Sequence, residues 1–124
     1  MLDHLGIDVS DYERSKAFYA AALAPLGCEL LMEPVPNACG FGSASDQKPF
    51  FWIYDRGNVN QGAHIAFAAP DRGTVDAFHE AALAAGASDN GGPGVREIYH
   101  PNYYGAFVLD PDGNNVEAVC HLPA

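Results

Sequence analysis

Hydrophobic and polar residues alternate at two places in the chain that lie about 60 residues apart. Leu5, Ile7 and Val9 alternate with smaller or polar neighbours in the first, and Ile65 and Phe67 do so in the second. A period of two is typical of a strand that buries one face. We therefore predict a strand at the start of each half of the chain.

A helical pattern follows each predicted strand. Ser10 with Glu13 three residues later predicts a capping box, and Asp71 predicts a second N-cap. Both patterns continue for about four turns. They end at Gly27 and Gly86, a residue type that readily adopts the left-handed conformation found at helix C-termini.

The two halves also resemble each other in sequence. With an offset of 60, eight residues are identical among the 21 positions of the segment 4–24, including His4 with His64 and Phe18 with Phe78. Chance similarity between two alanine-rich helices is the alternative explanation. The shared histidine and phenylalanine in one register favour a duplicated structural unit.

Short apolar or aromatic segments follow each helix, separated by Pro, Gly, Asn and Asp, and this pattern predicts strands. The segments are 28–32, 38–44, 49–55, 95–99, 104–110 and 115–121. The predicted order is therefore βαβββ twice within a single domain, residues 1–124. Module 1 spans about residues 1–58 and module 2 about residues 59–124. The fold class is α+β, with two curled sheets that form a cup and helices outside it.

The composition narrows the possible partners and the location. Six Lys and Arg against 16 Asp and Glu give a net charge of −10, so neither nucleic acid nor an anionic membrane is an expected partner. No apolar run approaches the roughly 20 residues of a membrane span. The opening residues do not resemble a secretion signal, which predicts a cytoplasmic protein. The widely spaced Cys28, Cys39 and Cys120 are predicted to be structural residues without disulfides.

Strand parity places three possible metal ligands on one surface. If Ile7 faces the helix, His4 faces the cup, and His64 does so by the same logic. In the last strand Val116 and Ala118 form the apolar set, so Glu117 points into the cup. A buried, unpaired carboxylate costs several kcal/mol. Two imidazoles and one carboxylate suit a divalent ion such as Fe, Mn, Ni or Zn, and we predict one such ion at this site.

Other readings of these residues stay open. His4 alone is compatible with an exposed terminal residue and His64 with a hydrogen-bonded core histidine. Glu117 has possible partners in Arg14, Arg72 and Arg96. His121 lies four residues beyond Glu117, about 13 Å along a strand, so the two cannot share one ion. We expect His121 to line the far end of the cup or to lie on the surface.

Three segments resemble a known family. They read LDHLGIDVSDYERSKAFYAAALAPLG, GAHIAFAAPDRGTVDAFHEAALAAG and YYGAFVLDPDGNNVEAVCH. They are similar to the glyoxalase/bleomycin-resistance/extradiol-dioxygenase superfamily, also called vicinal oxygen chelate, and the similarity covers essentially the whole chain. The family's metal ligands come from the first strand of each module and the last strand of the second, which here are His4, His64 and Glu117. The resemblance also implies a homodimer with cups completed across a twofold axis.

The sequence departs from the family pattern in the last strand of module 1. Members of the glyoxalase I type add a fourth, usually acidic ligand from this strand. Here Phe51 and Ile53 are expected to face the helix, which leaves Phe50, Trp52 and Tyr54 on the cup side. The remaining His-His-Glu set is similar to that of extradiol dioxygenases.

Extradiol dioxygenases also carry a histidine and a tyrosine beside the metal as acid/base partners. In this chain Tyr104, His100 or Tyr54 could take that part, and sequence alone does not place them.

These observations are compatible with several functions. The first is a metal-dependent enzyme, a dioxygenase or a glyoxalase-like lyase or isomerase, acting on a small substrate that chelates the ion through adjacent oxygens. Its catalytic residues would be Glu117 and Tyr104. Its substrate-binding residues would be Phe50, Trp52, Tyr54, Tyr104 and His121.

The alternative is metal-independent sequestration of a drug, as in bleomycin-resistance proteins. Aromatic residues and acidic charge favour it, but it does not explain two register-matched histidines with a glutamate. A third function, as a partner-binding module, rests only on the glycine-rich segment 86–94.

Overall fold

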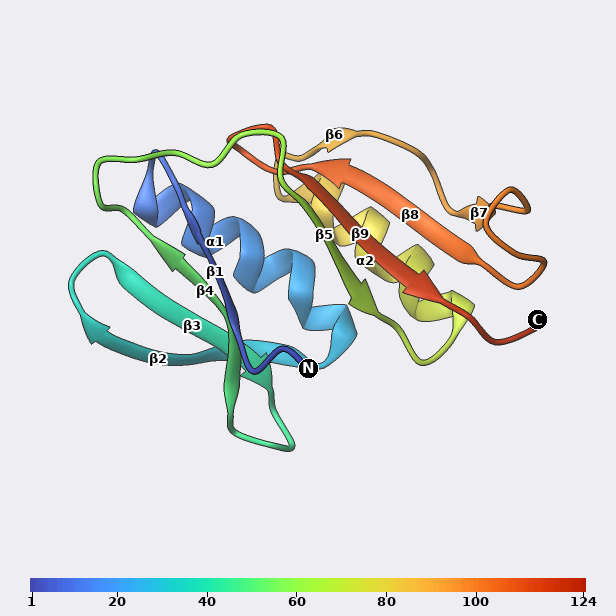
Figure 1. Cartoon of the computed structure of the whole chain (residues 1–124), viewed down its shortest axis with the longest axis horizontal. Helices are drawn as coiled ribbons and strands as arrows, with labels where there is room; N and C mark the ends of the chain where they lie inside the picture. The colour runs from blue at the N-terminus through green and yellow to red at the C-terminus, as the bar shows by residue number, and fades with distance from the viewer.

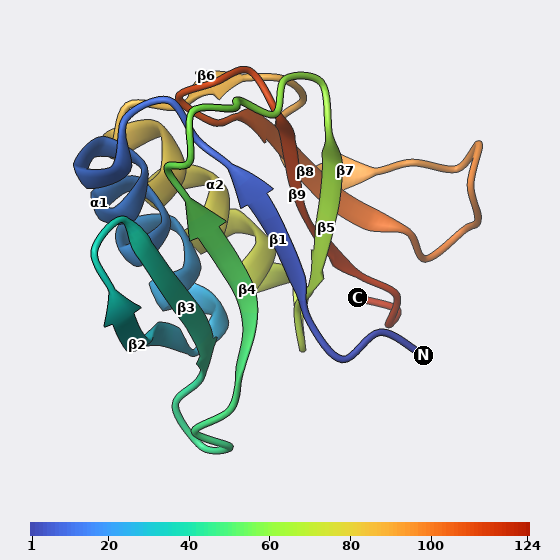
Figure 2. The same ribbon diagram turned by 60° about the vertical axis from the view of Figure 1, so that its left-hand side comes forward.

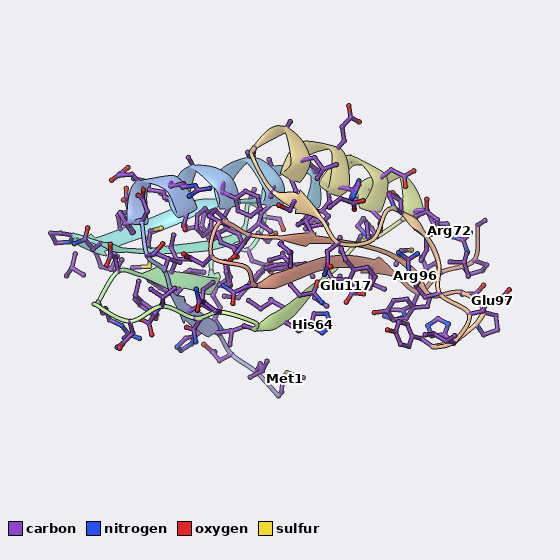
Figure 3. All side chains as sticks on the ribbon, turned by 90° about the horizontal axis from the view of Figure 1, so that it is seen from above. Met1, His64, Arg72, Arg96, Glu97 and Glu117 are labelled. Atoms are coloured by element: carbon purple, nitrogen blue, oxygen red, sulfur yellow. The ribbon has the colours of Figure 1, made fainter.

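The computed structural model describes all 124 residues. It contains two sheets that lie side by side, and two helices cover them from one side (Figures 1 and 3). The strand order is β1-β4-β3-β2 in one sheet and β5-β9-β8-β6 in the other, where β7 also pairs with β8. The elements are β1 (Leu5–Asp8), α1 (Tyr12–Leu23), the 3-10 helix η1 (Ala24–Leu26), β2 (Cys28–Val35), β3 (Ala38–Ser43), β4 (Pro49–Tyr54), β5 (His64–Ala68), α2 (Arg72–Ala84), β6 (Ser88–Asp89), β7 (Gly94–Val95), β8 (Tyr104–Leu109) and β9 (Asn115–Cys120).

The duplication is visible in the pairing of the strands. In each module the first strand pairs in parallel with the last, β1 with β4 and β5 with β9, and the remaining pairs are antiparallel. The α+β fold class with two curled sheets and outer helices is confirmed.

The predicted strand at 95–99 is wrong. Only Gly94–Val95 and Ser88–Asp89 pair with β8. Beyond them the chain turns, because the N–H groups of Tyr99 and His100 both donate to the carbonyl of Arg96. The main chain therefore bonds to itself in this stretch, and a loop leads from β7 to β8.

The first helix begins differently from the prediction. Its N-cap is Asp11, whose Oδ1 accepts from the Arg14 N–H at 3.2 Å, and not Ser10. Ser10 instead donates to the side chain of Asp112 in the β8–β9 turn. At the second helix the prediction is confirmed, since Asp71 caps α2 by accepting from a backbone N–H.

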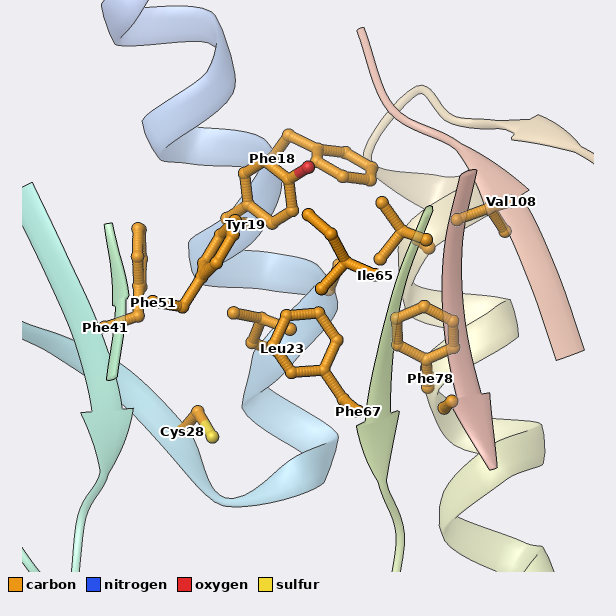
Figure 4. Packing of buried hydrophobic residues seen from close by; sticks show 14 of the residues in the cluster. Phe18, Tyr19, Leu23, Cys28, Phe41, Phe51, Ile65, Phe67, Phe78 and Val108 are labelled. Carbon is orange, nitrogen blue, oxygen red and sulfur yellow. The ribbon is translucent and has the colours of Figure 1, made fainter. Parts of the chain in front are cut away.

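One hydrophobic core extends through both modules between the sheets and the helices (Figure 4). The predicted strand faces are correct: Ile7, Val9, Phe51 and Phe67 are all buried. Phe51 and Phe67 meet edge to face across the boundary between the modules, with ring centroids 5.5 Å apart. The three cysteines are buried and free, as predicted.

A buried polar network also joins the modules. Tyr19 on α1 donates to Asp110 Oδ2 at 2.5 Å, and the Asn114 side-chain amide donates to the same oxygen at 3.0 Å. Asp110 Oδ1 accepts the N–H groups of Asp112 and Asn114, both at 2.9 Å. The β8–β9 turn of module 2 is therefore fixed to the helix of module 1. No helix of this fold is long and apolar enough to cross a membrane.

Candidate functional site

Glu117 and His64 meet on the face of the second sheet that the helices leave free (Figure 3). The strands β5 and β9 are parallel neighbours, and Ala66 lies opposite Glu117. The side chains of His64 and Glu117 therefore project from adjacent strands. His64 Nε2 lies 2.8 Å from Glu117 Oε1. Glu117 is 0% exposed, whereas the His64 side chain is 54% exposed. The half-exposed His64 imidazole thus lies between the buried Glu117 carboxylate and solvent.

Tyr103 completes the hydrogen bonding of this carboxylate. Its hydroxyl donates to Glu117 Oε2. Burial, followed by this hydrogen bond to Glu117, raises the pKa of Tyr103 to about 12. The phenol is therefore a proton donor at neutral pH and not a base.

The third predicted ligand is found elsewhere within the chain. His4 Nδ1 lies 2.7 Å from Asp3 Oδ1, and 57% of the His4 side chain is exposed. It lines a hollow of about 460 Å³ on the cup side of the first sheet, together with Trp52 and Tyr54. Within one chain the structure shows no group of three His, Cys, Asp or Glu residues that could hold a metal ion.

The cup is thus present as two half-cups. We call the surface around His4, Trp52 and Tyr54 the module-1 half-cup, and the surface around His64 and Glu117 the module-2 half-cup. The strands β1 and β5, which begin the two modules, run side by side without pairing (Figure 2). Residues from both line an apolar groove of about 480 Å³ between them.

Tyr104, which the sequence suggested as a catalytic and substrate-binding residue, lies on the helix side of the sheet. Its hydroxyl donates to Asp76 Oδ1 of α2 at 2.6 Å, and the Arg72 guanidinium lies over its ring at 4.9 Å. In β8, Tyr104 shares the helix-facing side with buried Ala106 and Val108. The prediction that Tyr104 lines the cup is therefore wrong, because its side chain packs against α2.

Sequence reasoning missed Tyr103 and Phe107. Both belong to the opposite parity of β8, and Phe107 stands opposite Glu117 in the ladder. The Phe107 ring lies 6.3 Å from the His64 ring. Side chains alternate along a strand, so residues one position away from Ala106 and Val108 had to face the cup side.

The aromatic residues of β4 that were predicted to bind substrate lie in two different places. Trp52 and Tyr54 lie nearly parallel on the module-1 half-cup, with an interplanar angle of 4° and ring centroids 6.4 Å apart. Phe50 lies in the groove between the modules, where its ring is 6.4 Å from that of Phe67.

His100 and His121 form a pair at the end of the module-2 half-cup. His100 Nδ1 accepts from the Asn102 N–H at 3.1 Å, so its proton lies on Nε2, which donates to His121 Nδ1 at 2.8 Å. The Tyr103 ring meets the His121 ring edge to face at 5.3 Å. The pair therefore ties the β7–β8 loop to the C-terminal end of β9.

Substituting His121→Ala is expected to loosen this loop. Losing a hydrogen bond of ordinary strength should accelerate amide hydrogen exchange in residues 97–102 about fivefold. His79→Ala removes a histidine contact of similar length elsewhere, from His79 Nε2 to Asp89 Oδ1 at 2.9 Å, and serves as the control. Unchanged exchange in the loop would show that the histidine pair does not hold it.

A protein-family model for the glyoxalase/bleomycin resistance protein/dioxygenase superfamily matches residues 1–118. The chain belongs to this superfamily. A search of curated proteins gave no match. Among solved structures, a glyoxalase/bleomycin resistance protein from Albidiferax ferrireducens is 29% identical, with a TM-score of 0.82 over 98% of this chain and 99% of that one.

Two further solved structures share the fold. A family enzyme from Burkholderia phytofirmans is 21% identical, with a TM-score of 0.74 over 96% of this chain and 97% of that chain. A lactoylglutathione lyase from Agrobacterium tumefaciens is 20% identical, with a TM-score of 0.66 over 97% and 92%. Membership in the glyoxalase/bleomycin resistance protein/dioxygenase superfamily agrees with the repeated βαβββ modules described above.

Proposed function

We propose that this superfamily member is a metal-dependent enzyme. Its ion would be held by His64 and Glu117 of one chain and by His4 of a second copy. The observation that carries the proposal is the fully buried Glu117 carboxylate, whose only ion-pair contact is His64. Neither Lys nor Arg compensates it, although an isolated carboxylate is expensive to bury. A divalent ion bound through the solvent-exposed His64 would supply the missing charge.

The donor set fits such an ion in part. A carboxylate and an imidazole are suitable ligands for Fe, Mn, Ni or Zn, and the two atoms are close enough for one ion to contact both. Tyr103 occupies Glu117 Oε2, so Oε1 stays directed at His64 Nε2. We therefore assign a positioning role beside Glu117 to Tyr103, whereas the sequence suggested Tyr104 as a catalytic acid/base partner.

His4 would come from a second copy of the chain. The ligands are divided between two half-cups, and pairing the module-1 half-cup of one copy with the module-2 half-cup of another would unite them in a homodimer. The resulting cup would be lined by Trp52, Tyr54 and Phe107. An aromatic lining favours a substrate with a flat, largely apolar part.

The bound ion would act as a Lewis acid toward a substrate with adjacent oxygens. The chain's own residues bind and orient that substrate. The aromatic lining would exclude water from the reacting atoms, and Tyr103 would hold its proton beside Glu117. Glu117 would serve as ligand and as proton acceptor.

Complementation between two ligand variants tests the shared site. His4→Ala and His64→Ala should each purify with almost no bound metal. If the ligands come from two copies, mixing the two variants under conditions that exchange subunits should restore metal at about a quarter of all sites, because half of the dimers are mixed and each mixed dimer has one intact site. Elemental analysis after desalting measures this directly.

Two results would contradict the proposal. If the wild type holds metal but the mixture holds as little as each variant alone, the ligands belong to a single chain. Negligible metal in the wild-type protein would instead favour the metal-independent sequestering function.

A further inference from the structure

Arg96 lies on the module-2 half-cup as a cation without a carboxylate partner. Its guanidinium carbon is 5.3 Å from the centre of the Phe107 ring, and that ring is 6.3 Å from the ring of His64. Figure 3 shows the labelled Arg96, Glu117 and His64 in the same part of the molecule. The arginine therefore borders the surface where a substrate would meet Glu117.

The guanidinium is held in place by the backbone around it. Nη1 donates to the Gly94 carbonyl at 2.9 Å and Nη2 donates to the Gly92 carbonyl at 2.8 Å. A Cβ added at Gly91 would lie 3.2 Å from Nη2 and 3.1 Å from the Phe107 ring, and one added at Gly94 would lie 3.1 Å from Nη1. The missing side chains of these two glycines leave the room that the arginine fills.

Arg96 differs in location from the other basic residues of the chain. Three of the six basic residues form ion pairs, Lys16 with Glu33, Lys48 with Asp3, and Arg56 with Asp8. Arg14 is exposed on the outer helix, and Arg72 lies over Tyr104 on the helix-facing side. Arg96 is thus the one basic residue without an ion pair that lies on the cup side, where the Gly92 and Gly94 carbonyls hold its guanidinium.

We propose that Arg96 recognises the carboxylate of the substrate, one oxygen of which would also chelate the metal together with the neighbouring keto or hydroxyl oxygen. A guanidinium has five N–H donors and only two are used, so three remain for a ligand. Their planar arrangement matches a carboxylate, and the Phe107 ring beneath keeps the plane fixed. The substrate class is therefore a 2-oxo or 2-hydroxy carboxylate with an apolar or aromatic substituent. This inference rests on the proposed function.

Two probes differ only in the group that Arg96 would bind. Phenylglyoxylate carries a carboxylate beside its ketone, and 1-phenyl-1,2-propanedione carries an uncharged acetyl group in the same place. Calorimetric titrations of metal-loaded protein would compare Arg96→Gln with the wild type. We expect about a tenfold or greater loss of phenylglyoxylate affinity, typical of a hydrogen bond to a charged group, and dione affinity within twofold.

Controls separate recognition from loop structure. Arg14→Gln makes the same change in net charge on the exposed surface of α1 and should leave both affinities unchanged. Arg96→Lys keeps the charge without the planar fork and should recover only part of the lost affinity. Added salt should weaken phenylglyoxylate binding in the wild type more than in Arg96→Gln.

Equal weakening of both probes in Arg96→Gln, or no weakening of either, would overturn the inference. Metal analysis of the same samples tests the proposed function separately. If the wild type holds no metal, the proposed function fails, and phenylglyoxylate binding to the metal-free protein still decides whether Arg96 selects the carboxylate.

Discussion

Replacing Glu117 with glutamine is expected to lower metal affinity by at least about 100-fold. Loss of partners that merely orient a ligand already costs up to that factor, and here the only charged ligand is lost. The glutamine keeps the size of the side chain and can still accept from Tyr103, so the fold should persist. Metal at 100 times its dissociation constant stabilises wild-type protein by about 2.7 kcal/mol, and Glu117→Gln should lose this gain.

Thermal unfolding with and without the ion, together with metal titration, measures both effects. Glu97→Gln, an exposed glutamate in the neighbouring loop without an ion pair, is the matched control. A Glu117→Gln protein that binds metal as tightly as the wild type would remove Glu117 from the ligand set.

Asp110→Ala should destabilise the protein by about 3–5 kcal/mol. Asp110 is 5% exposed, and its carboxylate accepts four hydrogen bonds, from Tyr19, Asp112 and twice from Asn114. Without it, the Tyr19 hydroxyl and the Asn114 amide remain buried without partners, each at a cost of about 1–3 kcal/mol. The total is a large share of the stability of an ordinary domain.

Urea unfolding gives this value from the shift of the midpoint at constant slope. Asp46→Ala, which removes an exposed carboxylate, should change the stability by less than about 0.5 kcal/mol. A loss of less than about 1 kcal/mol in Asp110→Ala would show that the bond between α1 and the β8–β9 turn contributes little to stability. Two unfolding transitions would mean that the modules unfold independently.

Much of the architecture could be predicted from local patterns. The alternation around Ile7 and Phe67 defined the buried strand faces, and the match of His4 with His64 revealed the repeat. The strand faces and the repeat could be predicted because a strand has an unambiguous side-chain period and a duplicated unit repeats its geometry. The same reasoning placed His4, His64 and Glu117 together, and within one chain only His64 and Glu117 meet.

Other features depend on tertiary contacts that local patterns do not contain. Ser10 fits the sequence pattern of an N-cap but instead donates to the side chain of Asp112, more than 100 residues away. The loop after Val95 carries apolar residues like a strand, yet its carbonyls bond within the loop. Tyr103 and Tyr104 are adjacent and chemically alike, so only the strand register tells which one reaches Glu117.

The segment between β6 and β8 carries Arg96, His100 and Tyr103. It is attached to the sheet through main-chain bonds, Asn90 N–H to the Phe107 carbonyl and Phe107 N–H to the Gly91 carbonyl. None of its residues belongs to the hydrophobic core. Mutations that alter ligand preference can therefore accumulate in one contiguous cassette while selection for folding acts elsewhere. Exchanging this cassette between relatives offers a direct route to new specificities on an unchanged scaffold.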